Sequence, residues 1–423
     1  MSRTSDAPAA MSADTPAGVP ADAFAAVSAD APAASRPSPT NWLAVVAVSA
    51  SVFSVVTTEM LPVGLLTSIG ASLDASAGTA GLAMTAPGVV AAVAAPVLTV
   101  ATARLDRRLV LAALVGLLTA ANLLSALATA LPVLLSARVL VGVAIGGVWS
   151  IAAGLAVRLV PAGSVGPATS VIFSGVAVAS VLGVPAGALI GELAGWRAAF
   201  AAMGALSLAV LVALVVLLPP LPPTRAVSLG EVPHLLRDAR VRAGLAVTAL
   251  VVTGHFAAYA YLRPVMEQVS GVGAGLVSTL LLVYGVAGIA GNFAAGAGAP
   301  RALRRTILAV TGLLTLSVLL IPVAGEAPAT VTVLLAVWGA AYGGVSISMQ
   351  TWLARAASRV PEAGSALFVA MFNIAISLGA LLGGRVADAV TVSGVMWLGG
   401  GLVACAAVTA FISRSVPERE ALP

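Results

Sequence analysis

Two charged side chains lie inside long apolar segments of this chain, where a charge needs a chemical reason. Glu59 falls inside the apolar segment 43–66, and Arg138 falls inside the segment 132–157. A charge at the centre of a membrane helix costs about 2.5–3.5 kcal/mol on insertion scales, so such residues pair with one another or mark ion and substrate pathways. Apolar surroundings favour the neutral form of a carboxyl group, whereas a nearby arginine favours its charged form. A carboxyl group under both influences can load and unload a proton.

Glu59 and Arg138 are predicted to lie at a similar depth in a membrane. Glu59 lies about seven residues before the end of its segment, and Arg138 about six residues after the start of its own. Because the two helices run in opposite directions, these ends lie on the same side of the membrane. At roughly 1.5 Å per residue, both side chains lie about 9–10 Å below that surface. Two interpretations are open. The pair can couple proton movement to another process, or it can be a fixed ion pair that orients two helices.

Further polar and aromatic residues are candidates for contact with a solute. His255 lies about twelve residues into its apolar segment, and an imidazole titrates near neutral pH. The predicted substrate-binding residues are His255, Tyr259, Trp149, Asn292, Tyr342 and Asn373. The alternative for each is a structural role, because polar side chains also hold membrane helices together.

The composition places these residues in an integral membrane protein. The chain is 60% hydrophobic and only 9% charged, whereas an ordinary soluble domain is about 25% charged. The net charge of +5 comes from arginines in short loops, so it indicates membrane topology and not nucleic-acid binding. We expect no metal site, because the single cysteine and two distant histidines lack the usual ligand spacing. No nucleotide-binding P-loop occurs, so we expect no ATP-driven transport. We also expect no cofactor, and no enzyme, because no soluble domain is predicted that could hold a catalytic set of residues.

Twelve apolar segments are long enough to cross a bilayer, which requires about 20 residues of helix. They are 43–66, 79–102, 109–130, 132–157, 167–190, 197–218, 243–262, 274–298, 306–324, 329–354, 365–385 and 395–413. A proline-rich and then basic connection over 219–242 separates one six-helix half, 40–218, from another, 243–413. Residues 1–39 have the composition of a disordered tail, and 414–423 form a short C-terminal tail.

The arginines predict the orientation of the chain. Of 21 arginines, 16 lie near the spans on the side of the chain ends, and only Arg197, Arg263 and Arg385 lie on the other side. Because cytoplasmic loops carry an excess of arginine and lysine, both chain ends are predicted to be cytoplasmic. We expect a multi-pass protein of the plasma membrane, of the bacterial inner-membrane type.

Three motifs resemble those of the major facilitator superfamily. The segment LLSARVLVGVAIGG (134–147) is similar to the fourth-span motif and places the membrane arginine of that family on Arg138. The segment 175–191 resembles the fifth-span antiporter motif, and RLDRR (104–108) resembles the basic end of the loop motif between the second and third spans. The antiporter motif falls on Gly175, Gly183, Pro185 and Gly187, and the loop motif falls on Arg104, Arg107 and Arg108. Upstream of RLDRR, this sequence differs from the family's loop motif: Ala103 stands where an acidic residue is usual, and Thr99 stands where a glycine is usual.

The resemblance covers about 40–415 and implies the all-α, twelve-helix major-facilitator fold in two six-helix halves. It favours the drug/proton-antiporter branch, which includes the arabinose-efflux type permeases. Segments such as TEMLPVGLLTSI (58–69) and GELAGWRAAF (191–200) look closer to purine-nucleoside efflux pumps, whereas 364–384 resembles sugar-efflux and chloramphenicol-resistance relatives as much.

The resemblance implies a monomeric, proton-coupled exporter of small neutral solutes such as nucleosides, sugars or drugs, acting by alternating access. Glu59 is then its first-span carboxylate. A proton-linked importer and a non-transporting membrane sensor are the alternatives.

Overall fold

The computed structural model describes residues 39–161, 164–222, 235–325, 327–358 and 361–413. The C-terminal tail predicted at 414–423 lies outside these residues, as does the predicted N-terminal tail except for Pro39, which begins the first helix. Residues 223–234 of the predicted central connection also lie outside them.

The first six spans are helical throughout the described residues. They are α2 (Pro39–Ser72), α3 (Ala77–Ala101), α4 (Arg107–Ala126), α5 (Leu131–Leu159), a fifth span of α6 (Val165–Val178), η2 (Ala179–Gly183) and α7 (Val184–Ala194), and α8 (Trp196–Leu217). Side-chain caps fix the start of some helices: Ser76 accepts a hydrogen bond from the backbone N–H of Thr79 at α3, and Asp106 accepts one from Arg108 at α4.

The second half repeats this organisation. It comprises α10 (Ala239–Tyr259), the short α11 (Leu262–Gln268), α12 (Ala274–Ala324), α13 (Pro328–Ala356), α14 (Pro361–Ala389) and α15 (Gly394–Ile412). The 51 residues of α12 are two helices joined at Ala302, whose φ of −147° and ψ of 66° are not helical. A straight helix of that length would exceed a bilayer core about twofold. The 11 helices of the described chain that are long and apolar enough to span a membrane therefore provide the twelve predicted spans, and the predicted fold class is confirmed.

Glycine contacts show that the two halves share one internal register. In the first half, Cβ atoms at Gly175, Gly183 and Gly187 would overlap Ser49, Thr57 and Leu61 of α2, each 126 positions earlier. In the second half, Gly379 and Gly383 of α14 meet Thr253 and Ala257 of α10 at the same separation of 126. Small residues let these parallel helices approach closely.

A second pair of helices repeats in the same way. Gly142 and Gly146 of α5 meet Pro87 and Ala91 of α3, each 55 positions earlier. In the other half, Gly339 and Gly343 of α13 meet Tyr284 and Gly288 of α12, again 55 positions earlier. The two halves therefore pack equivalent helices in equivalent registers, as expected for a fold built from repeated units.

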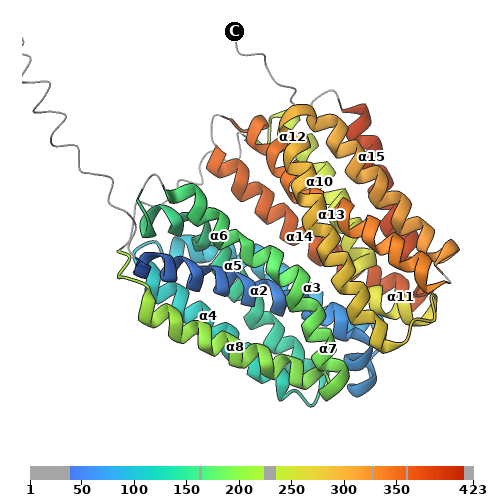
Figure 1. Cartoon of the computed structure of the whole chain (residues 1–423), viewed down its shortest axis with the longest axis horizontal. Coiled ribbons are helices and arrows are strands. Elements are labelled where there is room, and N and C mark those ends of the chain that lie inside the picture. The colour runs from blue at the N-terminus through green and yellow to red at the C-terminus, as the bar shows by residue number, and fades with distance from the viewer. Residues whose placement is uncertain (1–38, 162–163, 223–234, 326, 359–360, 414–423) are drawn as a thin grey trace, which may run out of the picture.

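The two halves lie side by side, the first coloured blue to green and the second yellow to red (Figure 1). Among the described elements, the main contacts between halves join α3 to α14, α7 and η2 to α12, and α2 to α11. We call the end of the bundle that holds the connections α2–α3 and α14–α15 the distal end, because both described chain ends lie at the opposite end. The polar contacts between halves described below lie at the distal end.

Candidate functional site

Arg138 joins three helices from a fully buried position on α5. Its Nε donates a hydrogen bond to the carbonyl oxygen of Ala83 on α3 at 2.7 Å. Its Nη1 and Nη2 donate to the carbonyl oxygens of Thr58 and Glu59 on α2, at 2.8 and 2.9 Å. The guanidinium group therefore holds the backbones of α2 and α3 at the level of Glu59.

Two prolines explain why two of these three carbonyl groups accept hydrogen bonds from a side chain. Pro62 and Pro87 lie inside α2 and α3, and a proline has no N–H to donate to the carbonyl four residues earlier. Those carbonyls belong to Thr58 and Ala83. Arg138 supplies the donors that the two prolines remove, so the buried guanidinium and the buried carbonyls satisfy one another.

Within the described residues, the side chains of Glu59 and Arg138 do not form a direct ion pair, a point that the sequence left open. The ion pair found in the described part of the chain joins Arg263 and Glu267. The Glu59 carboxyl group interacts electrostatically with Arg138 at longer range. Its Oε1 is buried and has no hydrogen-bond partner among the described residues. Three of the five N–H donors of the guanidinium group serve backbone carbonyl oxygens, and none of these hydrogen bonds goes to the Glu59 carboxyl group.

Other polar groups near Glu59 also lack partners. Asn122 of α4 donates from Nδ2 to the hydroxyl group of Thr58 at 3.1 Å, but its Oδ1 is buried without a partner. The hydroxyl groups of Ser54 and Thr57 on α2 are also buried without a hydrogen-bond partner in the described structure. Buried polar groups are normally hydrogen-bonded, so this concentration of unpartnered groups along α2 is unusual.

The second half carries a cluster of rings at the position that matches Glu59. His255 follows Thr253 by two residues, as Glu59 follows Thr57, and these two threonines face equivalent glycines. The imidazole of His255 stacks on Tyr342 with ring centroids 3.4 Å apart and on Tyr259 at 5.0 Å. We call the group formed by His255, Phe256, Tyr259, Tyr284, Trp338 and Tyr342 the aromatic cluster.

A hydrogen bond fixes the tautomer of His255. The indole Nε1 of Trp338 donates to Nδ1 of His255 at 3.0 Å, so Nδ1 carries no proton and the neutral imidazole carries its proton on Nε2. That Nε2 is buried without a partner among the described residues, and so is the hydroxyl group of Tyr284. The aromatic cluster therefore contains two buried polar groups without partners in the described structure, the Nε2–H of His255 and the hydroxyl group of Tyr284.

The remaining predicted substrate-binding residues lie outside the aromatic cluster. Trp149 stacks on Phe173 within the first half, with centroids 6.1 Å apart. Asn292 is exposed on α12, and Asn373 donates to the carbonyl oxygen of Val369 on its own helix. Trp338, a member of the cluster, was missed from the sequence. Its spacing was informative, because Trp338 and Tyr342 lie four residues apart on α13, as His255 and Tyr259 do on α10.

Most residues of the antiporter motif and of the loop motif make contacts within the first half. Gly175, Gly183 and Gly187 form the contact with α2, and Pro185 lies in the first turn of α7, directly after η2. Arg107 donates to the hydroxyl group of Thr102, and Arg108 to the carbonyl oxygen of Val215, all within the first half. Arg104 is exposed.

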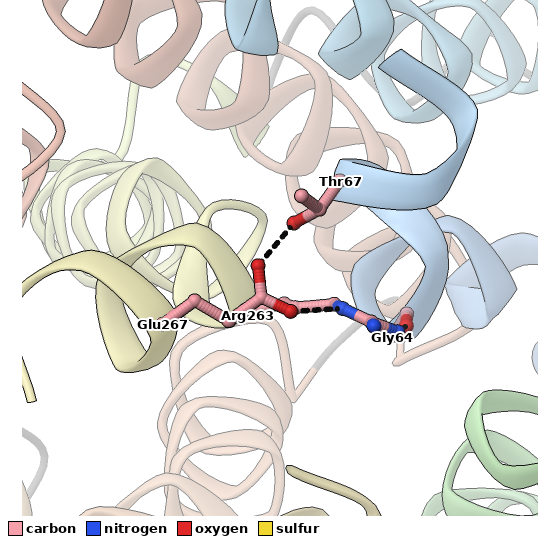
Figure 2. A network of polar contacts seen from close by, with 4 residues as sticks. All are labelled: Gly64, Thr67, Arg263 and Glu267. Atoms are coloured by element: carbon pink, nitrogen blue, oxygen red, sulfur yellow. Dashed lines mark hydrogen bonds and ion pairs between the residues drawn. The ribbon is translucent and has the colours of Figure 1, made fainter. Parts of the chain in front are cut away.

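A polar network joins the halves at the distal end (Figure 2). Arg263, at the start of α11, donates from Nη1 to the carbonyl oxygen of Gly64 on α2 and forms an ion pair with Glu267 at 2.8 Å. Thr67 of α2 donates to the other carboxylate oxygen of Glu267, also at 2.8 Å. We call these four residues the distal latch. The Glu267 carboxylate is therefore paired through both of its oxygens.

A second set of contacts closes the same end. Asp388 of α14 accepts hydrogen bonds from the hydroxyl group of Ser76 at 2.7 Å and from the backbone N–H of Gly78 at 2.8 Å. Both donors lie at the N-terminus of α3, where a carboxylate is favoured by the helix dipole. The hydroxyl group of Tyr261 donates to the carbonyl oxygen of Ala380 at 2.8 Å, and a Cβ at Gly81 of α3 would overlap it.

Comparison with known proteins identifies the family. Residues 48–368 match the Major Facilitator Superfamily over most of the bundle. The chain belongs to this superfamily. Its family and fold are those of a membrane transporter and not of an enzyme, and a small-molecule substrate follows from that membership.

One protein of similar sequence and two solved structures of similar fold carry different functional names. The transcription regulatory protein OpdE of Pseudomonas aeruginosa is 34% identical over 352 residues, which cover 82% of this chain and 88% of that protein. A bacterial homologue of the human lysosomal transporter Spinster, in an inward-facing and unoccupied conformation, superposes with a TM-score of 0.72 at 17% identity, over 89% of this chain and 98% of that one. The nucleoside transporter NupG, as a point mutant, superposes with a TM-score of 0.68 at 12% identity, over 86% and 99%. These two solved structures share the fold.

Proposed function

We propose that this protein is a proton-coupled exporter of small neutral solutes in the plasma membrane, with both chain ends cytoplasmic and the monomer as the working unit. The observation that carries the proposal is the Glu59 carboxyl group, which is buried on α2 with Oε1 unpartnered in the described structure. Its arginine neighbour donates hydrogen bonds to backbone carbonyl oxygens and not to this carboxyl group. A carboxyl group in this setting can change its charge without breaking an ion pair.

Proton exchange at Glu59 would be linked to alternating access of the two halves. A proton taken up from outside neutralises Glu59, and its release to the cytoplasm accompanies the return of the empty protein. The solute moves in the opposite direction in the other half of the cycle. Arg138 keeps α2 and α3 fixed at this level throughout the transport cycle. It donates hydrogen bonds to the two carbonyl oxygens that have no backbone donor because of Pro62 and Pro87.

The contacts at the distal end suit the inward-open stage of this cycle. If the chain ends are cytoplasmic, the distal end faces outward. The distal latch and the cap of Asp388 on α3 then keep the outer side closed. Opening outward must break the cross-half bonds, but the ion pair of Arg263 and Glu267 stays within α11. Neither charge is left uncompensated, so the latch can open and close reversibly.

Nucleosides are the leading solute class, with sugars and amphenicol-type drugs next. Glu59 and Arg138 are the charged side chains that lie well inside the described spans, away from the helix ends, so a neutral solute fits better than an ionic one. The similarity of fold to the nucleoside transporter NupG supports the same order. The segments that resemble purine-nucleoside efflux pumps include Glu59 itself.

The proposal is tested by export from cells loaded with radiolabelled inosine, arabinose or chloramphenicol. Wild type is compared with Glu59→Gln, and each is assayed with and without a protonophore. The matched control is Glu192→Gln, because Glu192 is an exposed carboxylate on α7. We expect one solute to leave faster with wild type and Glu192→Gln, and the gain to vanish with Glu59→Gln or the protonophore. Full export by Glu59→Gln would refute the coupling role of Glu59.

A regulatory role is the second candidate, because the relative with 34% identity is named a transcription regulatory protein. The described chain contains membrane helices and short connections and no separate soluble domain among those residues. A regulatory effect would then arise through the solute that the protein moves or senses. Proteoliposomes decide between the two: a transporter moves solute in the absence of any transcription machinery, and a sensor that does not transport leaves it in place.

A further inference from the structure

The aromatic cluster concentrates side chains that are scarce elsewhere in the chain. Aromatic residues make up only 4% of the sequence, with four tyrosines and two histidines. Three of those tyrosines and one histidine meet in the cluster, together with Trp338 and Phe256. The bundle is otherwise packed with alanine, valine, leucine and glycine. A core needs no phenol or imidazole groups, and burying them without partners costs free energy.

The rings are arranged as a wall with one accessible surface. His255 covers one face of Tyr342 at 3.4 Å with an interplanar angle of 9°. Phe256 meets Tyr342 edge-on, with an interplanar angle of 88°. His255 is fully buried, and Tyr259 and Tyr284 are 7% exposed. Tyr342 is the half-buried tyrosine of the group, so it forms the surface that a molecule from outside the cluster can reach.

The cluster lies where the two halves meet. A Cβ at Gly285, next to Tyr284, would overlap the backbone of Ser180 in η2 of the first half. The hydroxyl group of Tyr342 interacts electrostatically with the carboxyl group of Glu59 across the same boundary. The repeated register of the halves gives the same placement, because His255 matches Glu59 in position. The aromatic cluster therefore lies at the boundary between the two halves, in the position of the second half that matches Glu59 in the first.

We propose that the aromatic cluster is a subsite for a planar aromatic ring of the solute, with Tyr342 as the stacking platform and His255 as the residue that positions it. This inference rests on the proposed function and narrows its solutes to ring-bearing ones, such as nucleosides and amphenicols. Plain sugars are excluded. Offset stacking suits a planar ring of any composition, and base–aromatic stacking is tolerant of the base. Trp338 holds His255 in place through Nδ1, so the platform is preorganised.

The test is equilibrium binding to the purified full-length protein in nanodiscs, without any ion gradient. The probes are radiolabelled inosine, uridine and chloramphenicol, which carry planar rings, and arabinose, which does not. We expect at least one ring-bearing probe to bind the wild type and arabinose not to bind. Tyr342→Phe should keep the affinity within about twofold. Tyr342→Leu should weaken it about 5- to 150-fold, the range for loss of one stacking contact.

Three further variants complete the design. Trp397→Leu removes an exposed ring on α15 and is the matched control, which should bind as wild type does. His255→Ala should weaken binding of the ring probe through loss of positioning, and His255→Phe, which restores a ring behind Tyr342, should recover most of it. A merely structural histidine would not show this recovery. Size-exclusion profiles identify folded variants, and Tyr342→Phe shows that the site tolerates change.

Each result decides the proposal. Unchanged binding by Tyr342→Leu, binding of arabinose alone, or no binding of any ring-bearing probe would overturn it. The proposed function fails separately. Ring binding that depends on Tyr342, combined with no proton-dependent export, would refute the exporter and leave the subsite intact. Proton-dependent export of arabinose, combined with no binding of ring-bearing probes, would refute the subsite and leave the exporter intact.

Discussion

The distal latch offers a direct test of how the two halves open. Thr67→Val keeps the shape of the side chain and removes one hydrogen bond between halves, the bond to the carboxylate of Glu267 at 2.8 Å. The ion pair within α11 and the bond from Arg263 to Gly64 are left in place. The closed distal end therefore loses one defined contact, and the open state loses nothing.

The size of the effect follows from the chemistry and exposure of this bond. A hydrogen bond to a charged group contributes about 1.5–3 kcal/mol to stability. The Glu267 side chain is 22% exposed and Thr67 is exposed, so solvent screening reduces the value to about 1–2 kcal/mol. That corresponds to about a 5- to 30-fold rise in the ratio of open to closed molecules. An open population of about 1% would become about 5–20%.

Distances between spin labels at the distal end measure this shift. The single cysteine, Cys405, is exposed and is first replaced by serine. Labels at Ala71 and Val390, both exposed at the distal end, report the separation of the halves. Labels at Ala71 and Thr129, which lie in the same half, should give one unchanged distance. In Thr67→Val we expect a longer-distance population to grow for the first pair only.

The matched control is Thr332→Val, which removes a hydrogen bond to Pro328 within α13 and none between halves. If Thr67→Val leaves the distance distribution of the cross-half pair as in wild type, Thr67 and Glu267 do not hold the distal end closed. The same conclusion follows if Thr332→Val produces an equal shift.

Two further predictions concern the packing that positions Glu59. Gly175→Ala should lower the thermal unfolding midpoint of the purified protein, because the added methyl group overlaps the carbonyl oxygen of Ser49 and overpacking costs about 1–3 kcal/mol. Gly154→Ala, which has nothing within 4 Å of the new Cβ, should leave the midpoint unchanged or raise it slightly, and equal midpoints for the two variants would contradict the close contact of α2 and α6. Arg138→Lys should cost about 3 kcal/mol or more and abolish export, because a compact ammonium group lacks the planar fork of donors with which arginine reaches carbonyl oxygens on two helices. A lysine variant with the thermal unfolding midpoint and the export rate of wild type would show that the hydrogen bonds from Arg138 to α2 and α3 are dispensable.

Much of the fold could be predicted from local properties of the chain. Crossing a bilayer depends on the length and apolarity of each segment alone, because every backbone polar group must be satisfied within its own helix. The segments 274–298 and 306–324 were separable from sequence even though their helices run together as α12. Arg138 and Glu59 were found for the same reason, since charges in apolar segments stand out. The proton-coupling and substrate roles of the site residues stay predictions.

The tertiary structure alone decided which groups meet. The sequence contained Pro62 and Pro87, four residues after Thr58 and Ala83, but only the packing of α2, α3 and α5 brings those two carbonyls to one guanidinium group. Distances along a single helix cannot reveal this, because the three helices contact one another through faces whose pairing depends on the whole bundle.

The aromatic cluster and the distal latch have the same origin. Their members are separated by up to 203 positions between Gly64 and Glu267, and each helix alone shows only that one of its faces is polar or aromatic. The free energy of burying every span together selects the register in which those faces meet. Sequence therefore determined the spans and the unusual side chains within them, whereas the packing of distant helices determined their partners.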